Sequence, residues 1–269
     1  MNPPLIDLTG RRILVIGGGQ GMGEATCLMA ARVGASVAVL DREASPATHV
    51  AEAVEASGGK AVAITADVLN DEDLAEGIRT AHDRLGGLDG LVTIVGRAIW
   101  SPLLEMTRDE WQLTQDINLR YVFVAAQRFA QSLVTDGHGG SIVHVASVDG
   151  IRSAPEHAGY GAAKAGLLDL TRSAAIEWAA HAIRVNAVAP GAIVSPRIPL
   201  RSASDEHALM SRVPLAHRGS ADDIAGGVVY LLSDLARYVT GHTLVIDGGL
   251  LAVGPLEYGD ERSRLGAHR

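Results

Sequence analysis

Cysteine and aromatic residues are scarce in this chain of 269 residues. Its single cysteine, Cys27, excludes an intrachain disulfide and is typical of a protein from a reducing compartment, so we expect a cytoplasmic location. Aromatic residues make up only 4% of the chain, although 47% is hydrophobic. The core must therefore be built from small and branched aliphatic side chains, which suits helices packed closely on a parallel sheet.

The sequence also lacks the features of a membrane or nucleic-acid-binding protein. Residues 1–4 are not a basic segment leading into an apolar one, so we expect no secretory signal. No apolar run approaches the ~20 residues that span a bilayer. The net charge is −8 and the basic residues form no stripe, which argues against nucleic acid as a partner. His207 and His217 have no carboxylate cluster at metal-ligand spacing, so we predict no metal site.

Short runs of β-branched residues alternate with helical patterns along the chain. The runs predict strands at 12–16, 36–40, 61–65, 90–95, 141–146, 183–189 and 243–247, and the patterns predict helices at 21–33, 47–57, 71–85, 107–135 and 159–180. This alternation predicts an α/β fold, namely a Rossmann-like, doubly wound parallel sheet in three αβα layers. No linker divides the chain, so we expect residues 1–269 to form one domain.

Two segments do not follow this alternation. Residues 192–218 contain Pro196, Pro199 and Pro214 together with several charges, and we expect them to form a mobile loop beside the substrate. The tail, residues 255–269, is polar and is expected to be loosely held.

The first predicted strand runs into a glycine-rich turn and then directly into a helix. The turn reads Gly17-Gly18-Gly19-Gln20-Gly21-Met22-Gly23. Glycines let the backbone approach a phosphate closely, and a helix N-terminus offers it unpaired N–H groups and the positive end of the helix dipole. Glycines alone are compatible with a structural turn, but the strand before them and the helix after them favour a dinucleotide-binding loop.

Residues after the second and third predicted strands indicate which dinucleotide binds. Asp41 can accept hydrogen bonds from both adenosine ribose hydroxyls and would repel a 2′-phosphate, which favours NAD over NADP. It could also cap the following helix. Arg42 keeps NADP open, because a guanidinium can pair with a 2′-phosphate or stack on adenine. Asp67, followed by Val68, is placed to meet the adenine, although Asp67 could equally be a turn residue.

Three polar residues form a candidate reacting centre. Ser147 follows the strand predicted at 141–146, at the carboxyl end where ligands bind in open parallel sheets. Tyr160 and Lys164 lie four positions apart on one helix face. A free tyrosine has a pKa near ~10, and a nearby ammonium or the positive nicotinamide ring would lower it. Tyr160 is therefore a candidate acid/base for an alcohol proton, and Ser147 would hold the substrate oxygen.

From residue 8 to about residue 251 the sequence resembles the short-chain dehydrogenase/reductase family. The motifs that carry the resemblance are the glycines Gly17, Gly21 and Gly23, then Ser147, then Tyr160-Gly161-Ala162-Ala163-Lys164. The resemblance implies that Asn118 is a fourth catalytic residue, which anchors a water in a proton relay from Lys164. It also implies that Lys164 binds the nicotinamide ribose.

The resemblance extends to Arg184-Val185-Asn186-Ala187-Val188-Ala189-Pro190-Gly191 and to Asp247-Gly248-Gly249. It implies that Ile193 contacts the nicotinamide carboxamide through its backbone and that Ser195 bonds to the same group. The cofactor-binding residues expected in all are Gly17, Gly19, Gln20, Gly21, Met22, Gly23, Asp41, Arg42, Asp67, Val68, Gly96, Tyr160, Lys164, Pro190, Gly191, Ile193 and Ser195.

The family resemblance further implies a homotetramer or homodimer joined through the helix that carries Tyr160. That helix is rich in alanine, which permits close helix approach; the residues are Ala162, Ala163, Ala165, Ala174 and Ala175.

Three positions depart from the family pattern. Ile16 and Ser195 both stand where threonine is usual, and Ser195 keeps the hydroxyl. The family's Asn-Asn-Ala-Gly run reads Thr93-Ile94-Val95-Gly96 here. The first of those asparagines ties the central strands together. Because the Thr93 hydroxyl cannot donate and accept as an amide does, that link is in doubt.

The substrate is expected between residues 192–218, residues 149–157 and the segment after Gly96. Candidate lining residues are Arg97, Trp100, Asp149 and His157, although Arg97 is equally compatible with an exposed surface position. The Ile, Leu, Pro and Trp residues of these segments favour a medium-sized cyclic or aryl alcohol over a sugar. Two residues are expected to be buried without a role: His144, with its polar atoms satisfied, and Cys27.

Together these features predict reversible hydride transfer between NAD(H) and a secondary alcohol or ketone. One alternative is a nucleotide-sensing regulator on the same fold, but a sensor needs none of Asn118, Ser147, Tyr160 and Lys164. A methyltransferase would leave the Tyr–Lys spacing and Pro190-Gly191 unexplained. An NADP-dependent ketone reductase stays open because of Arg42.

Overall fold

The computed structural model describes residues 6–196, 198 and 202–253. Within them, seven parallel strands form one sheet in the order β3-β2-β1-β4-β5-β6-β7. The strands are β1 (Arg12–Ile16), β2 (Ser36–Asp41), β3 (Lys60–Thr65), β4 (Gly90–Thr93), β5 (Gly140–Val145), β6 (Ile183–Pro190) and β7 (Thr243–Ile246). The expected tail, 255–269, and Pro199 lie outside the described residues.

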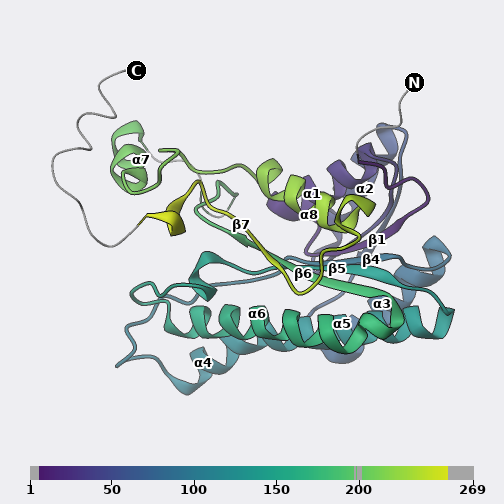
Figure 1. Cartoon of the computed structure of the whole chain (residues 1–269), viewed down its shortest axis with the longest axis horizontal. Helices are drawn as coiled ribbons and strands as arrows, with labels where there is room; N and C mark the ends of the chain where they lie inside the picture. Colours follow the sequence, from purple (N-terminus) through teal and green to yellow (C-terminus); the bar gives the residue numbers. More distant parts are fainter. Residues whose placement is uncertain (1–5, 197, 199–201, 254–269) are drawn as a thin grey trace.

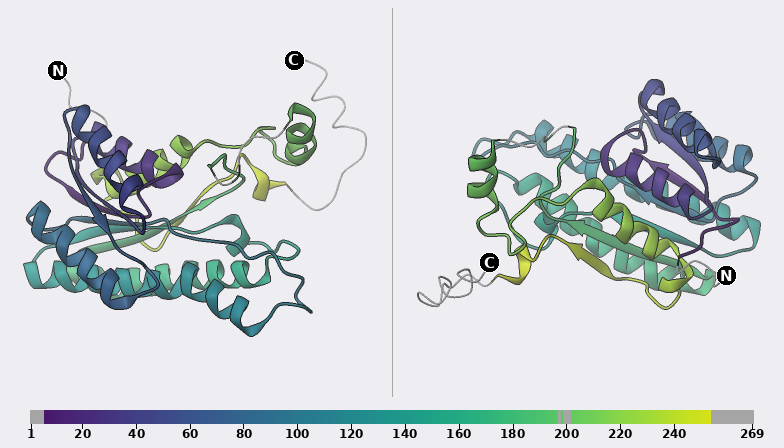
Figure 2. Two further views of the ribbon diagram at one scale, coloured as in Figure 1. Left: turned by 180° about the vertical axis from the view of Figure 1, so that it is seen from behind. Right: turned by 90° about the horizontal axis from the view of Figure 1, so that it is seen from above.

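Helices cover both faces of this sheet, which confirms the predicted three-layer α/β fold (Figure 1). One face carries α1 (Gly21–Arg32), α2 (Ala44–Ala56) and α8 (Ala221–Leu232). The other carries α3 (Asp71–Leu85), α5 (Tyr121–Asp136) and α6 (Ala158–Trp178). Figure 2 shows α1 and α8 side by side. In the described part of the chain, no helix combines the length and the apolar character needed to cross a membrane.

Each central strand is buried on both faces, so its alternate side chains pack in two separate apolar layers. In β1, Leu14 and Ile16 pack with α3, α5 and α6, whereas Ile13 and Val15 pack with α1, α2 and α8. The largest fully buried side chains are aliphatic apart from Tyr121 and Phe129 on α5. The scarcity of aromatic residues is thus met by close packing of aliphatic side chains.

Two helices were not predicted. Residues 203–210, inside the segment expected to be a loop, form α7 (Ala203–Met210), which Ser202 caps by accepting from the Asp205 N–H. Helix α8 follows a capping box between Ser220 and Asp223. Its interior glycine pair, Gly226-Gly227, lowers helix propensity and obscured the pattern. The apolar face of α8 packs on the sheet, and this packing outweighs the propensity.

The helix predicted at 107–135 is interrupted. It consists of α4 (Arg108–Gln115), a π-helical turn (Asp116–Arg120) and α5. In the π turn the Tyr121 N–H reaches back to the Asp116 carbonyl, which accommodates one extra residue without breaking the rod. Periodicity cannot reveal such an insertion, because apolar positions continue on both sides. The turn contains Asn118.

A glycine makes the passage from β1 to α1 possible. Gly17 adopts φ +90°, which turns the chain sharply after β1. Gly23, in the first turn of α1, then lies so close to Gly17 that a Cβ on Gly23 would overlap the Gly17 carbonyl oxygen. Helix and strand therefore approach each other more closely than any side chain would permit.

Alanine substitutions at two helical glycines test this approach. We expect Gly23→Ala to lower the free energy of unfolding by about 3 kcal/mol, since backbone must move to admit the methyl group. Gly226→Ala is the matched control, because no atom lies within 4 Å of its Cβ position. It should raise the free energy of unfolding by up to about 1 kcal/mol. Urea unfolding measures both, and equal midpoints for the two variants would contradict the close approach.

The link between the central strands, which the sequence left in doubt, is made by a different pair. Thr93 and His144 are directly paired in β4 and β5, and the Thr93 Oγ1 lies 2.9 Å from the His144 Nδ1. Both residues are fully buried. The expectation that His144 is buried is confirmed, but only half of its ring is satisfied, since no partner for its Nε2 is found among the described residues.

His144 should make the protein sensitive to acid. Burial, with a smaller effect of the Lys164 charge, lowers the pKa of His144 to about 3, whereas in the unfolded chain it titrates near ~6.5. Between these values the unfolded state binds a proton that the folded state excludes. Acidification from pH 7 to pH 5 should therefore remove about 2 kcal/mol of stability through this residue alone.

The measurement compares the free energy of unfolding at pH 7 and pH 5. His144→Asn, which cannot titrate, should lose less stability on acidification than the parent. His49→Asn is the control, because His49 is exposed on α2. This variant should lose as much free energy of unfolding between pH 7 and pH 5 as the parent. If all three proteins lose the same amount, His144 does not account for the acid sensitivity.

Candidate active site

The candidate residues gather where the strands end. All seven strands are parallel, so their carboxyl ends meet at one edge of the sheet. The strand order reverses between β1 and β4, and ligands of open α/β sheets bind at such a reversal. The turns that follow these two strands touch there, since a Cβ on Gly17 would lie 2.8 Å from the Val95 Cγ2.

The glycine turn has the geometry of an anion cradle. Gln20, the residue before α1, is exposed and makes no side-chain cap. The Gly23 N–H donates to the Gln20 carbonyl at 3.2 Å, so the N–H groups of Gly21 and Met22 are those of the first turn that a ligand could use. The Gly19 N–H donates to Asp41 Oδ2 at 3.1 Å, and a Cβ on Gly19 would lie only 2.8 Å from that oxygen. The turn thus fits a dinucleotide pyrophosphate. Met22 is half-buried and packs on the α1 side of the core.

Asp41 ends β2 beside this cradle. It is half-buried, and its Oδ1 lies 3.4 Å from the Glu43 nitrogen. The alternative that Asp41 caps α2 is wrong, because Glu43 occupies the N-cap position. Arg42 is exposed, and its guanidinium lies 3.8 Å from the Glu43 carboxylate. Asp41 therefore presents a carboxylate beside the glycine turn, and the Arg42 guanidinium lies near an acidic neighbour.

Asp67 acts as a turn residue after β3, which is one of the two roles considered for it. Its Oδ1 accepts from the Leu69 N–H at 2.9 Å, and its own N–H donates to Asp73 Oδ2 at 2.6 Å. Val68 is buried. These bonds fix the turn after β3, and contact of Asp67 and Val68 with adenine stays a prediction.

The segment after β6 is pinned to β7. The Gly191 N–H donates to the Ile246 carbonyl, and a Cβ on Gly191 would lie 2.7 Å from the Asp247 Cα, so only glycine fits after Pro190. Further along, Ile193 pairs with Gly219 in an isolated parallel bridge. Ser195 Oγ accepts from the Ile198 N–H at 3.2 Å, which leaves its hydroxyl hydrogen free to be donated.

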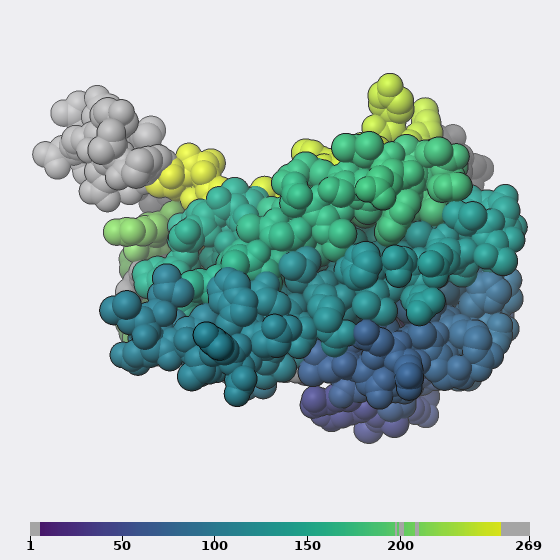
Figure 3. Space-filling view, turned by 90° about the horizontal axis from the view of Figure 1, so that it is seen from below, coloured from purple at the N-terminus to yellow at the C-terminus, as the bar shows by residue number. Residues whose placement is uncertain are grey.

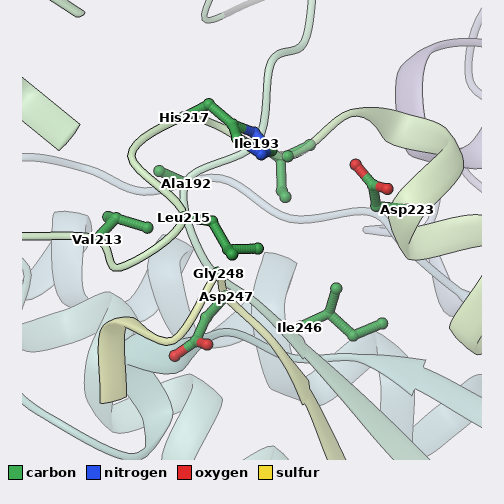
Figure 4. A pocket seen from close by; sticks show the side chains of 10 residues that line it. Ala192, Ile193, Val213, Leu215, His217, Asp223, Ile246, Asp247 and Gly248 are labelled. Carbon is green, nitrogen blue, oxygen red and sulfur yellow. The ribbon is translucent and has the colours of Figure 1, made fainter. Parts of the chain in front are cut away.

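A pocket of about 140 Å³ lies beside this segment (Figure 4). Figure 4 shows Leu215 and Ile193 directed toward one another across it, above Ile246 on β7. It is lined by Ala192, Ile193, Val213, Leu215, His217, Gly219, Asp223, Ile246, Asp247 and Gly248. Ser147 and Tyr160 are not among these residues, so the pocket lies apart from the candidate reacting centre.

Sequence reasoning missed one neighbour of the glycine turn. Pro196 lies over it, with its Cδ 3.4 Å from the position of a Cβ on Gly21. The loop after β6 therefore reaches across to the loop after β1. No local sequence pattern signals this contact, because it joins distant segments of the chain.

Ser147, Tyr160 and Lys164 meet where β5 ends and α6 begins. Ser147 Oγ accepts from the Asp149 N–H at 3.1 Å, in the short helical turn Val148–Gly150. Tyr160 stands in the first turn of α6. Lys164 is 2% exposed, lies with its Nζ 5.7 Å from the Tyr160 ring centroid, and donates to the Val145 carbonyl at 2.9 Å. The three residues are brought together as expected.

Burial is the main cause of the pKa shifts of Tyr160 and Lys164. It raises the pKa of Tyr160 to about 12; the neighbouring Ser147 hydroxyl opposes the rise and the Asp149 charge adds to it. Burial also lowers the pKa of Lys164 to about 8. The expected lowering of the Tyr160 pKa by Lys164 stays a prediction, since in the protein alone burial raises that pKa. The Lys164 ammonium lies 5.7 Å from the ring centroid and donates to a backbone carbonyl.

Asn118 holds the turn after β4 with its side chain. Its Nδ2 donates to the carbonyls of Arg97 and Thr114, each at 2.8 Å, and its Oδ1 accepts from the Arg97 N–H at 3.0 Å. Gly96 lies between Asn118 and Lys164, so a Cβ there would approach both side chains. Both donors of the amide are thus committed to the protein, and the water-anchoring role expected of Asn118 stays a prediction.

Three of the four candidate substrate-lining residues converge beside Tyr160. His157 Nδ1 lies 2.8 Å from Asp149 Oδ2, and the His157 ring centroid lies 3.6 Å from the Trp100 ring and 5.6 Å from the Tyr160 ring. Arg97 is exposed, and its bonds to Asn118 involve its backbone. Within the described residues, no group of three or more His, Cys, Asp or Glu side chains is arranged to hold a metal ion.

The chain is similar to known proteins over most of its length. The family model described as Enoyl-(Acyl carrier protein) reductase matches residues 17–251. The chain is 34% identical to an L-rhamnose 1-dehydrogenase (NAD(P)(+)) from Sphingomonas sp. (strain SKA58), over 90% of this chain and 97% of the relative. It is 36% identical to a 2,5-dichloro-2,5-cyclohexadiene-1,4-diol dehydrogenase from Sphingobium indicum, over 92% and 99%.

A solved structure is similar over nearly the same length. The putative short-chain alcohol dehydrogenase from Sinorhizobium meliloti 1021 is 38% identical, covers 93% of this chain and 100% of its own, and superposes with a TM-score of 0.88. Sequence motifs, strand order and these relatives all agree: the chain belongs to the short-chain dehydrogenase/reductase family of oxidoreductases.

Proposed function

We propose that this protein transfers a hydride between NAD(H) and a secondary alcohol or ketone, with Tyr160 as the acid/base. The observation that carries the proposal is the stack of Ser147, Tyr160 and buried Lys164 at the sheet edge that also holds the glycine cradle. A nucleotide sensor would have no use for a buried lysine beside a half-buried tyrosine, since burial of the ammonium costs desolvation free energy.

The residues divide the work of alcohol oxidation. Ser147 donates a hydrogen bond to the alcohol oxygen, and the Tyr160 phenolate accepts the hydroxyl proton. Bound NAD supplies the hydride acceptor and places a positive charge near the phenol. The alcohol thereby loses one proton and one hydride and becomes a ketone. In the reverse direction, Tyr160 returns its proton to the carbonyl oxygen.

Because the pKa of Tyr160 is raised, this residue needs the positive charge of the bound cofactor to act as a base. A phenol with a pKa of about 12 is protonated at neutral pH, which suits ketone reduction but opposes alcohol oxidation. A positive charge nearby lowers that pKa. The proton then leaves along Lys164, whose own pKa of about 8 permits it to pass a proton on. Asn118 holds the Gly96–Arg97 turn that borders this path.

Asp41 supports NAD as the cofactor, because its carboxylate is half-buried and has no cation bonded to it among the described residues. A 2′-phosphate would meet this charge directly. The name of the rhamnose dehydrogenase includes both NAD and NADP, so relatives do not separate the two. A preference for NADP would favour the alternative, a ketone reductase that uses the Arg42 guanidinium.

We expect the substrate to be a medium-sized cyclic or aryl alcohol. The exposed Trp100 ring, which packs on His157 beside Tyr160, offers an apolar surface for a ring. The relative named for a cyclohexadienediol is consistent with this expectation, whereas the relative named for rhamnose keeps a sugar open.

A homotetramer or homodimer joined through α6 also remains a prediction. Figure 3 shows the face formed by α4, α5 and α6, which would supply the contact. Of the alanines expected to permit it, Ala162 and Ala165 are exposed, whereas Ala163, Ala174 and Ala175 are turned inward and pack in the core.

Removal of one hydroxyl tests the acid/base. We expect Tyr160→Phe to lower kcat/KM for secondary alcohols at least about 10²-fold, because the substitution removes the hydroxyl that is proposed to accept the proton. NAD binding, measured by calorimetry, should change little. Tyr238→Phe is the matched control, since Tyr238 is fully exposed away from the site. Turnover by Tyr160→Phe at the parent's rate would show that the mechanism is wrong.

Asp41→Asn tests the choice of cofactor. The amide keeps an oxygen for the Gly19 N–H but removes the charge, so we expect the ratio of kcat/KM with NAD to that with NADP to fall at least about tenfold. Arg42→Gln, at the exposed neighbour, should leave the ratio nearly unchanged. NADH absorbance follows both reactions. A parent enzyme that prefers NADP would contradict the role given to Asp41.

A further inference from the structure

His157 is a buried base that the proposed mechanism does not use. It is 9% exposed, and its Nδ1 lies 2.8 Å from Asp149 Oδ2. An ionised carboxylate only accepts hydrogen bonds, so Nδ1 carries the hydrogen in this pair. In the neutral ring the other nitrogen, Nε2, is then an acceptor. Asp149 thus fixes the orientation of the ring, and it also fixes which ring nitrogen is the acceptor.

The acceptor at Nε2 has no partner among the described residues. A buried polar atom without a hydrogen bond costs roughly 1–3 kcal/mol, so such atoms are uncommon unless a ligand or water satisfies them. His144 has the same deficiency, but it lies inside the sheet, between β4 and β5. His157 differs because it lies just before α6, at the sheet edge where the substrate is expected.

The neighbours of His157 place it at the reacting centre. Its ring lies between Trp100, at 3.6 Å, and Tyr160, at 5.6 Å between centroids. Trp100 is 66% exposed and forms the outer wall of this group. Asp149, which holds the imidazole, also donates its N–H to Ser147 Oγ at 3.1 Å. Asp149 therefore connects His157 with Ser147, the serine proposed to bind the substrate oxygen.

We propose that His157 is a specificity-determining residue, whose Nε2 accepts a hydrogen bond from a second hydroxyl of the substrate. The substrate class is then a cyclic 1,2-diol, with one hydroxyl at Ser147 and Tyr160 and the other, on the adjacent carbon, at His157. A simple alcohol leaves Nε2 unpaired, and an ether oxygen at the same position cannot donate to it. The inference rests on the proposed function, because it needs Tyr160 to mark the reacting carbon.

Matched substrates test the inference on the unaltered protein. The probes are cyclohexanol, cyclohexane-1,2-diol in its cis and trans forms, and the corresponding 2-methoxycyclohexanols, each assayed with NAD. We expect kcat/KM for the better diol isomer to exceed that for cyclohexanol and for its methyl ether at least about tenfold. Equal values for diol and ether would overturn the inference, since they would show that the second hydroxyl donates no important bond.

Variants then assign the preference to His157. His157→Phe keeps a ring against Trp100 and Tyr160 but removes the nitrogen, so the diol preference should fall at least about tenfold while cyclohexanol turnover stays within about threefold. His157→Gln retains an acceptor and should restore part of the preference. His49→Phe, on the exposed surface of α2, is the control.

The outcomes separate this inference from the proposed function. An unchanged diol preference in His157→Phe, or an equal loss for diol and cyclohexanol, would overturn the role of His157, and the equal loss would make it a residue that positions Tyr160. If the parent oxidises none of these alcohols with either cofactor, the proposed function itself fails.

Discussion

The contact between the turn after β1 and the turn after β4 determines where the other site residues lie. Gly17 and Val95 pack so closely that no side chain fits on the glycine. The Val95 carbonyl accepts a hydrogen bond from the buried Tyr121 hydroxyl at 2.8 Å, and Tyr121 begins α5 directly after the π turn. The reversal of strand order, the glycine cradle and the helix that carries Asn118 are thus held to one another through two short turns.

Buried polar groups extend this framework into the site. The Asn118 amide bonds to the N–H and the carbonyl of Arg97, Lys164 bonds to the end of β5, and Thr93 joins His144 across β4 and β5. The same burial shifts protonation, because it favours the neutral forms of tyrosine, lysine and histidine alike. The framework therefore keeps Tyr160 and His144 neutral at pH 7, whereas Lys164, with a pKa of about 8, stays largely protonated there.

Much of this arrangement could be predicted from residues alone. The strands are short apolar runs, and the glycine turn and the Tyr–Lys spacing are local patterns, so period and spacing located all of them. The π turn at Asn118 could not be found, because one inserted residue does not change the apolar pattern around it. The replacement of an asparagine by Thr93 and His144 was equally hidden, since it depends on the register between two strands that lie far apart in sequence.

Helix α8 shows the same limit in another form. Its glycine pair weakens the local propensity, and only its packing against the sheet and α1 makes it a helix. The Asp41 capping alternative failed for a local reason, because α2 starts later than a cap at that residue requires. Errors therefore arose where tertiary contacts, or a shift of a residue or two, decide the outcome.

Asp149 shows how the site balances opposing demands. Its charge raises the pKa of Tyr160 and so works against alcohol oxidation. A reacting centre that needed only Ser147, Tyr160 and Lys164 would function better with a neutral residue at this position. The carboxylate also orients His157, which lies 5.6 Å from the Tyr160 ring and presents an unpaired buried nitrogen. The unfavourable charge is intelligible if Asp149 serves substrate recognition through His157, because orientation of a neutral imidazole requires a fixed acceptor at Nδ1.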